Sequence, residues 1–89
     1  MKNISITKQF KRDAKKYYLS LLTPSWTEVL SCLLNDKPLP EKYKDHKLTG
    51  NLKDLRDCHI KPDLVLLYRL CESEIELIRL GSHSEIGIS

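Results

Sequence analysis

Five residues in the second half of the chain have side chains that suit acid–base chemistry on an anion. They are His46, His59, Asp63, Arg79 and His83. Histidine both accepts and gives up a proton near neutral pH. The planar guanidinium of arginine matches the oxygens of phosphate or carboxylate groups. The histidines are expected at strand ends and in loops, beside the arginine and the aspartate. This combination indicates an enzyme that transfers protons to or from an anionic substrate.

The size of the chain limits the kind of site it can build. Its 89 residues predict one domain, 1–89, with a thin core and little room for a deep pocket. A groove or an open sheet face suits a polymeric substrate better than a small metabolite. The balance of 15 basic and 12 acidic residues gives a formal charge of +3, which permits nucleic-acid binding without requiring it.

The first half of the chain predicts a short strand followed by two helices. Residues 4–6 alternate like a strand, and apolar residues recur at helical spacing over residues 10–21. Ser25 and Glu28 have the spacing of a capping box, which predicts a second helix that ends near residue 34. We expect the two helices to form a hairpin.

The second half predicts strands. Residues 55–60, 64–70 and 74–80 are strand-like, and the second of these is apolar enough to be covered on both faces. We expect one extra short strand near residues 47–48, and His83 in a loop or short helical turn. The predicted fold class is α+β, of order β-α-α-β-β-β, with two N-terminal helices packed on one face of a small, mainly antiparallel β-sheet.

Strand alternation predicts which candidates share a face. Side chains alternate between the two faces of a sheet, and the helices can cover only one of them. The hypothesis is that the helices cover the face that carries Cys58, Ile60, Ile78 and Leu80. In that arrangement His59 and Arg79 both point to the open face, unless a bulge shifts the register.

A group of basic residues offers a surface for RNA. One face of the first predicted helix carries five cations, and two more lie just before and within the first long strand: Lys8, Lys11, Arg12, Lys15, Lys16, Lys53 and Arg56. Phosphates would bind such a stripe. A solvated helix surface is an equally good interpretation of the helical part. We expect the aromatic residues Tyr17, Tyr18 and Trp26 to belong to the core.

Several of these segments resemble one protein family. Segment 44–50, the run Arg56-Asp-Cys-His59-Ile-Lys-Pro-Asp63, segment 66–68 and the run Arg79-Leu-Gly-Ser-His83 resemble the YafQ family of bacterial toxins, within the RelE/ParE superfamily. The resemblance covers nearly the whole chain. It implies a RelE-like toxin of a type II toxin–antitoxin system, a ribosome-dependent mRNA endoribonuclease that inhibits translation and needs neither metal nor cofactor.

The resemblance also implies roles for the candidate residues. His46, His59, Asp63, Arg79 and His83 stand where the family has catalytic or RNA-contacting residues. Either His59 or His83 would be the base that activates the 2′-hydroxyl, with the other as the acid, and Arg79 would stabilise the phosphorane. Asp63 would orient an imidazole or hold a ribose, and His46 would transfer a proton or contact a phosphate.

The sequence departs from the family at two positions. Leu64 and Gly87 stand where many members have aromatic residues, which stack on bases. We therefore expect a different grip on the substrate.

The resemblance implies two partners. One is mRNA in the A site of the 30S ribosomal subunit, next to rRNA. The other is a cognate acidic antitoxin, partly disordered, which would complement the basic surface. We expect a cytoplasmic protein with no membrane association, because the three cysteines read as reduced residues and no signal-peptide or membrane-spanning run is apparent.

Three other interpretations of the chain remain open. A non-catalytic toxin like ParE would bind and inhibit gyrase, although such an inhibitor has no need of the histidines. A degenerate member would only bind its antitoxin. The three histidines with an aspartate could also compose a zinc site, although no His-x-x-x-His pattern supports one.

Overall fold

The computed structural model describes residues 1–50 and 54–87 of the chain. Its elements follow one another in this order: β1 (Asn3–Ile6), α1 (Lys8–Lys16), the 3-10 helix η1 (Tyr18–Leu22), α2 (Pro24–Leu34), the 3-10 helix η2 (Glu41–Tyr43), β2 (His46–Lys47), β3 (Arg56–Lys61), β4 (Leu64–Leu70), β5 (Glu74–Gly81) and α3 (His83–Ile86).

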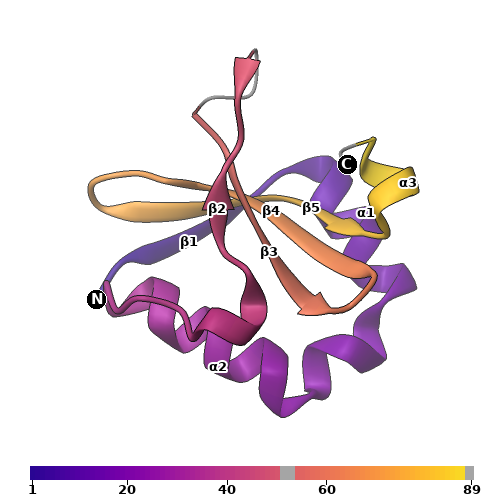
Figure 1. The fold of residues 1–89 in the computed structure, drawn as a ribbon, viewed down its shortest axis with the longest axis horizontal. Helices are drawn as coiled ribbons and strands as arrows, with labels where there is room; N and C mark the ends of the chain where they lie inside the picture. Colours follow the sequence, from indigo (N-terminus) through magenta and orange to yellow (C-terminus); the bar gives the residue numbers. More distant parts are fainter. Residues whose placement is uncertain (51–53, 88–89) are drawn as a thin grey trace.

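The strands form one sheet of order β1-β5-β4-β3-β2. β1 pairs with β5 in parallel, and the other neighbours are antiparallel. α1 and α2 run along the sheet, and α3 lies beside α1 where β5 ends (Figure 1). The predicted α+β class is confirmed. The expected extra strand is β2, and His83 begins the short helix α3, as predicted.

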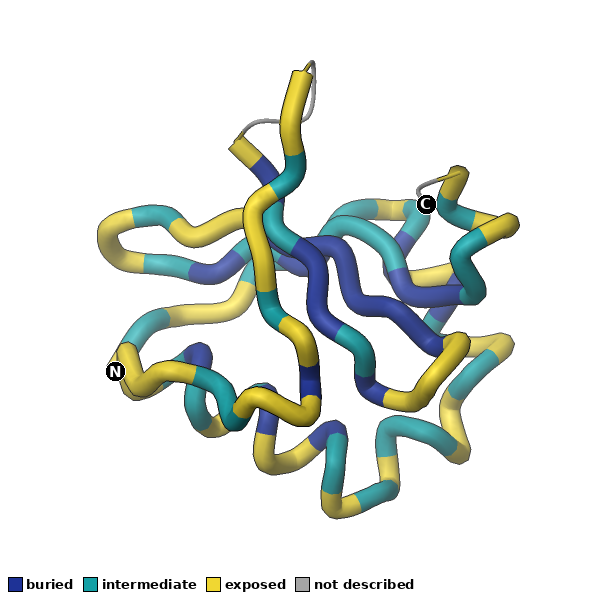
Figure 2. Tube along the Cα trace, viewed as in Figure 1, coloured by how far each residue is buried: buried dark blue, intermediate teal, exposed yellow. Residues whose placement is uncertain are grey.

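The core lies between the sheet and the helices, and β4 runs through its centre. Leu64 to Tyr68 are all buried, so β4 is covered on both faces as its unbroken apolar sequence predicted. Buried chain is concentrated in β3, β4 and β5 (Figure 2). The helices contribute Phe10, Trp26, Val29 and Leu33 to this core.

The first helix is shorter than predicted. α1 ends at Lys16, and Tyr17 lies outside helical geometry as its C-cap, with a 3-10 helix continuing from Tyr18. The tighter turn bends the chain toward α2 through a hydrogen bond from the Ser20 amide to the Tyr17 carbonyl. Of the aromatic residues expected in the core, Trp26 is buried, Tyr17 is half-buried, and Tyr18 is exposed, which contradicts the prediction.

The capping box predicted at Ser25 is wrong. Helix α2 begins at Pro24, and Thr23 is its N-cap, with the Thr23 hydroxyl accepting from the Trp26 amide. Proline favours the first helical position because its φ is already helical and it has no N–H to leave unpaired. Glu28 therefore does not close the box and instead accepts a hydrogen bond from the Tyr43 hydroxyl.

The face prediction for β5 is correct at Leu80 and wrong at Ile78. The register against β4 shifts, because Leu67 pairs with Arg79 while Tyr68 pairs with Leu77. Ile78 is the extra residue, so Leu77 and Leu80 both reach the core although they have opposite parity. The Thr7 hydroxyl donates to the Ile78 carbonyl over 2.6 Å and so satisfies this irregular backbone.

Cys58 and Ile60 of β3 do face the helices, as the alternation predicted. Cys58 is buried, and Cys32 and Cys71 are partly exposed. Within residues 1–50 and 54–87, no helix has both the length and the apolar character that crossing a bilayer requires.

The cap of α2 gives a test of its starting point. Thr23→Ala should destabilise the protein by about 1 kcal/mol, since the Trp26 amide loses its acceptor. That loss should lower Tm by several degrees in a domain of this size. Ser25→Ala, at the position that the sequence pattern favoured, is the matched control and should stay close to wild type in thermal unfolding. A larger loss from Ser25→Ala would contradict the cap at Thr23.

Candidate active site

The open face of the sheet carries a row of candidate residues across four strands. His46 of β2 pairs with Asp57 of β3, Asp57 pairs with Leu67 of β4, and Leu67 pairs with Arg79 of β5. Directly paired residues point to the same face. Arg79 therefore shares the face of Asp57 and lies two strands away, roughly 10 Å at the usual strand spacing.

A second row brings two histidines together. His59 follows Asp57 on the same face of β3, and His83 enters from the first turn of α3. Their ring centroids are 4.9 Å apart, with the planes at 73°. The structure thus brings these two candidate residues side by side.

Asp63, in the hairpin between β3 and β4, fixes the orientation of His83. Its Oδ1 atom accepts a hydrogen bond from the His83 amide at 3.1 Å and lies 2.8 Å from His83 Nδ1. These bonds hold the pKa of Asp63 below its ordinary value. A carboxylate can only accept, so Nδ1 of His83 carries a proton and Nε2 is left for a substrate.

The sequence analysis missed Asp57, whose carboxyl group lies beneath the histidines. Only 1% of the residue is exposed. Burial raises the pKa of Asp57, and the nearby charges of His46, His59 and His83 act in the opposite direction. Within the described part of the chain, Asp57 Oδ1 has no hydrogen-bond donor. A buried carboxyl oxygen without a donor is expensive in free energy, which makes Asp57 a further candidate site residue.

His46 joins the site from the edge strand β2. Its Nδ1 atom lies 2.9 Å from the Lys44 carbonyl oxygen and 3.2 Å from Asp57 Oδ1. The hydrogen bond goes to the carbonyl, so the contact with Asp57 is electrostatic. Nδ1 therefore carries the proton, and Nε2 of the exposed ring remains free to meet a substrate.

Arg79 is held by a helix instead of by its neighbours in the sheet. Its Nε and Nη2 atoms donate to the buried carboxylate of Asp13 in α1 at 3.0 and 3.2 Å. Burial alone would raise the pKa of Asp13, but the bonds from Arg79 and from the Leu80 amide lower it overall. Glu76, on the same strand, accepts a hydrogen bond from Arg69 instead.

The same helix also anchors α3. Glu85 accepts hydrogen bonds from Lys16 of α1, from the Ser82 amide and from Tyr17, which follows α1 as its C-cap, and these bonds hold its pKa at about 2. Arg79 Nη1 adds a long contact of 3.4 Å to the Glu85 carbonyl. Contacts with α1 and its C-cap therefore hold the chain on both sides of His83: Arg79 before it binds Asp13, and Glu85 after it binds Lys16 and Tyr17.

The predicted RNA-binding residues are dispersed. The five basic residues of α1 are exposed, and Lys16 is engaged by Glu85. Arg56 lies on the opposite face of β3 from His59, where its Nη2 donates to Asp45 at 2.8 Å. Lys53 lies outside the described residues. RNA contact by these residues stays a prediction.

The two departures from aromatic residues have clear structural settings. Leu64 is buried in the core and presents nothing to a base. Gly87 ends α3 with a left-handed φ of 82°, which glycine adopts without strain.

The surroundings of His59 lower its pKa. Partial burial lowers its pKa below 6.5, and the neighbouring charge of His83 lowers it further. Asp57 acts in the opposite sense, and Lys44 adds to the lowering. His59 is therefore neutral at pH values where an ordinary histidine is already partly protonated.

The zinc interpretation gains no support from the geometry. Among residues 1–50 and 54–87, no three histidine, cysteine, aspartate or glutamate side chains are grouped closely enough to hold a metal ion. The His59 and His83 rings lie 4.9 Å apart, with Asp63 bound to His83, and His46 lies beside Asp57.

Comparisons with known protein families and sequences agree on one family for this chain. The profile of the family described as "Bacterial toxin of type II toxin-antitoxin system, YafQ" matches residues 2–87. A putative toxin YafQ of Haemophilus influenzae is 41% identical, covering 96% of this chain and 91% of that protein. The mRNA interferase toxin YafQ of Escherichia coli is 33% identical, covering 96% and 95%.

Solved structures agree with this assignment. A metal-bound toxin from Helicobacter pylori superposes with a TM-score of 0.85 at 43% identity, covering 97% of this chain and 99% of that one. The E. coli DinJ–YafQ complex gives a TM-score of 0.80 at 31% identity, covering 97% and 98%.

The electrostatics of the site predict opposite effects of two substitutions on His59. His83→Gln should raise the pKa of His59, because a repelling charge is removed. Asp57→Asn should lower it, because an attracting carboxylate is removed. NMR titration of the His59 Cε1–H signal measures both, with amide spectra showing that each variant is folded. Shifts in the same direction would contradict the arrangement.

Proposed function

The chain belongs to the YafQ family of bacterial toxins of type II toxin–antitoxin systems and acts as an mRNA endoribonuclease, and we propose that it cleaves RNA by histidine acid–base catalysis. The observation that supports this mechanism most is the His59–His83 pair, 4.9 Å between ring centroids, with Asp63 orienting one ring. A gyrase inhibitor or a protein that only binds an antitoxin would have no use for such a pair.

In the proposed reaction the nucleophile belongs to the RNA. The neutral imidazole of His59 takes the proton of a 2′-hydroxyl, and the 2′-oxygen attacks the adjacent phosphorus. The bond from phosphorus to the 5′-oxygen then breaks, and that oxygen takes a proton from the Nε2–H of a charged His83. The products are a 2′,3′-cyclic phosphate and a 5′-hydroxyl, so atoms and protons balance. The lowered pKa of His59 supports its assignment as the base.

Arg79 is the proposed electrostatic partner of the phosphorane. Its guanidinium is already bound to Asp13, which fixes the plane of the side chain while the outer edge remains partly exposed. A preoriented cation stabilises developing charge without reorganising during the reaction. Asp13 would then be a positioning residue, and His46 would hold a neighbouring phosphate or relay a proton.

The remaining partners follow from the family. The E. coli relative has been solved in complex with DinJ, and we propose that this chain is likewise held inactive by a cognate acidic antitoxin. We further propose that it cleaves mRNA in the ribosomal A site, in the cytoplasm, with its basic surface against rRNA. The net charge of +3 supports both contacts.

Loss of either central histidine should disable cleavage while the fold persists. His59→Gln and His83→Gln should each lower the cleavage rate of ribosome-bound mRNA by about 10²–10⁴-fold, the usual contribution of a positioned acid or base. Lys37→Gln, at an exposed position away from the histidines, is the control.

The pH dependence gives a second readout of the same reaction. Cleavage by wild-type protein should fall as pH drops through the pKa of His59, and that fall should occur below about 6.5, the ordinary histidine value. Detection of the cyclic phosphate on the 5′ fragment checks the chemistry. Intact RNA with wild-type protein, together with blocked DNA supercoiling, would refute the nuclease and favour a gyrase inhibitor.

A further inference from the structure

A cavity opens directly beside His59, outside the cluster of catalytic candidates. Its volume is about 320 Å³, and it lies between the end of β3, the 3-10 helix η2 and the start of α2. We call it the lysine pocket; it is lined by Ser25, Lys42, Tyr43, Lys44, His59, Ile60, Lys61 and Pro62. Its volume falls at the lower end of the range of about 300–1,000 Å³ that is usual for ligand sites.

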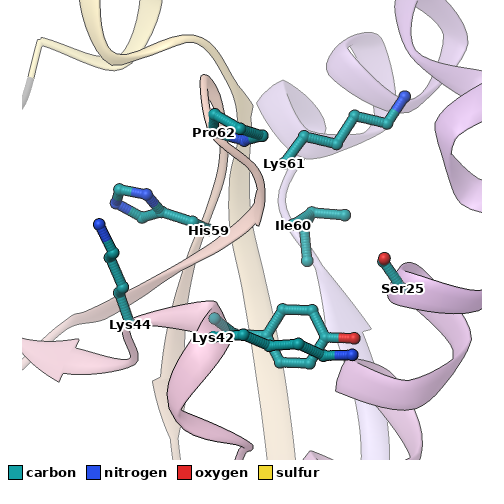
Figure 3. A pocket seen from close by; sticks show the side chains of 8 residues that line it. Ser25, Lys42, Lys44, His59, Ile60, Lys61 and Pro62 are labelled. Atoms are coloured by element: carbon teal, nitrogen blue, oxygen red, sulfur yellow. The ribbon is translucent and has the colours of Figure 1, made fainter.

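Cations stand on two sides of the lysine pocket. Lys44 extends beside the His59 ring, and Lys61 extends from the other side of the same strand end toward η1 (Figure 3). Lys61 makes only a 3.3 Å contact with the Ser20 hydroxyl, which is uncharged. Within the described part of the chain, the Lys44 ammonium has no carboxylate partner. Lys42, by contrast, is paired with Glu28 at 3.4 Å.

The walls of the lysine pocket are partly apolar. Ile60 and Tyr43 are buried and form its floor, while Pro62 is exposed at the rim. An apolar floor with cations at the edges suits a planar base or sugar bound between two phosphates. The position of Lys44 is also unfavourable for a simple solvated surface, because its positive charge lies close enough to His59 to lower the pKa of that histidine.

Two other cavities are larger but do not place cations beside a histidine. One is lined by residues from Cys32 to Leu70, among them Asp36, Lys37 and Arg56, and Arg56 is already paired with Asp45. Another lies between residue 1 and helix α2 and has no charged side chain among its described lining residues. Neither is lined by a histidine among the described residues.

We propose that the lysine pocket is a nucleotide subsite, which binds the RNA residue next to the scissile phosphate while Lys44 and Lys61 hold the flanking phosphates. The inference rests on the proposed function, since it places RNA on both sides of His59. It also accounts for the loss of aromatic residues at Leu64 and Gly87. Without those aromatic side chains to stack on bases, RNA is bound instead by the cations at the edges of the lysine pocket.

The test uses RNA that cannot be cleaved. A short single-stranded 2′-O-methyl oligonucleotide lacks the nucleophile, so binding is measured separately from chemistry. Titrated into ¹⁵N-labelled wild-type protein, it should shift the amide signals of residues 42–44 and 59–61. The affinity should fall with salt, with a slope that reports about 0.7 per phosphate contact for single strands.

Two matched variants separate local contacts from overall charge. The double variant Lys44→Asn, Lys61→Gln removes the pocket cations, with asparagine chosen because residue 44 has a left-handed φ of 50°. The double variant Lys37→Gln, Arg69→Gln removes two exposed cations elsewhere. Both lower the formal charge from +3 by 2, to +1.

The pocket variant should bind about tenfold more weakly than its control, with a salt slope smaller by roughly 1.4, the loss of two phosphate contacts. Equal affinity of the two variants would overturn the subsite, as would amide shifts confined to α1. Normal RNA binding by the pocket variant with loss of binding to poly-glutamate would overturn it in favour of an acidic peptide.

Failure of the nuclease would look different. Wild-type protein that shifts the pocket amides with uncleavable RNA but leaves ribosome-bound mRNA intact would refute the proposed function and keep RNA binding in the pocket. Cleavage of mRNA with no pocket shifts would retain the nuclease and refute the subsite.

Discussion

The site depends on one buried carboxyl group. Asp57 lies almost fully covered beneath His46, His59 and His83, and burial opposes its ionisation while the three imidazoles favour it. The pKa of His59 in turn depends on its neighbours, because His83 lowers it and Asp57 raises it.

A second constraint comes from the start of the chain. Asp13 binds Arg79 and the Leu80 amide, while Lys16 and Tyr17 bind Glu85. One turn of α1 thus holds the strand end and the helix that supply the guanidinium and one imidazole. The N-terminal helix is therefore part of the framework of the candidate site, whatever its outer lysines bind.

Sequence patterns predicted the parts of this structure that local chemistry decides. The unbroken apolar run of β4 and the alternation in β3 identified the buried strand and the open face of His59. Asp57 could not be found that way, because an acidic residue inside a strand usually faces water. Asp13 lies among lysines, and its partner is 66 residues away. The bulge at Ile78 depends on Thr7, 71 residues away, and no local signal marks it.

The hydroxyl of Thr7 makes two hydrogen bonds, one as acceptor and one as donor. It accepts from the Phe10 amide at the start of α1 and donates to the Ile78 carbonyl of the bulge. β1 can join the sheet only through β5, because β5 is its single neighbour among the described strands. A chain without β5 would therefore leave β1 unpaired among the described strands and could not form the bulge, so the N-terminal strand can join the sheet only together with β5.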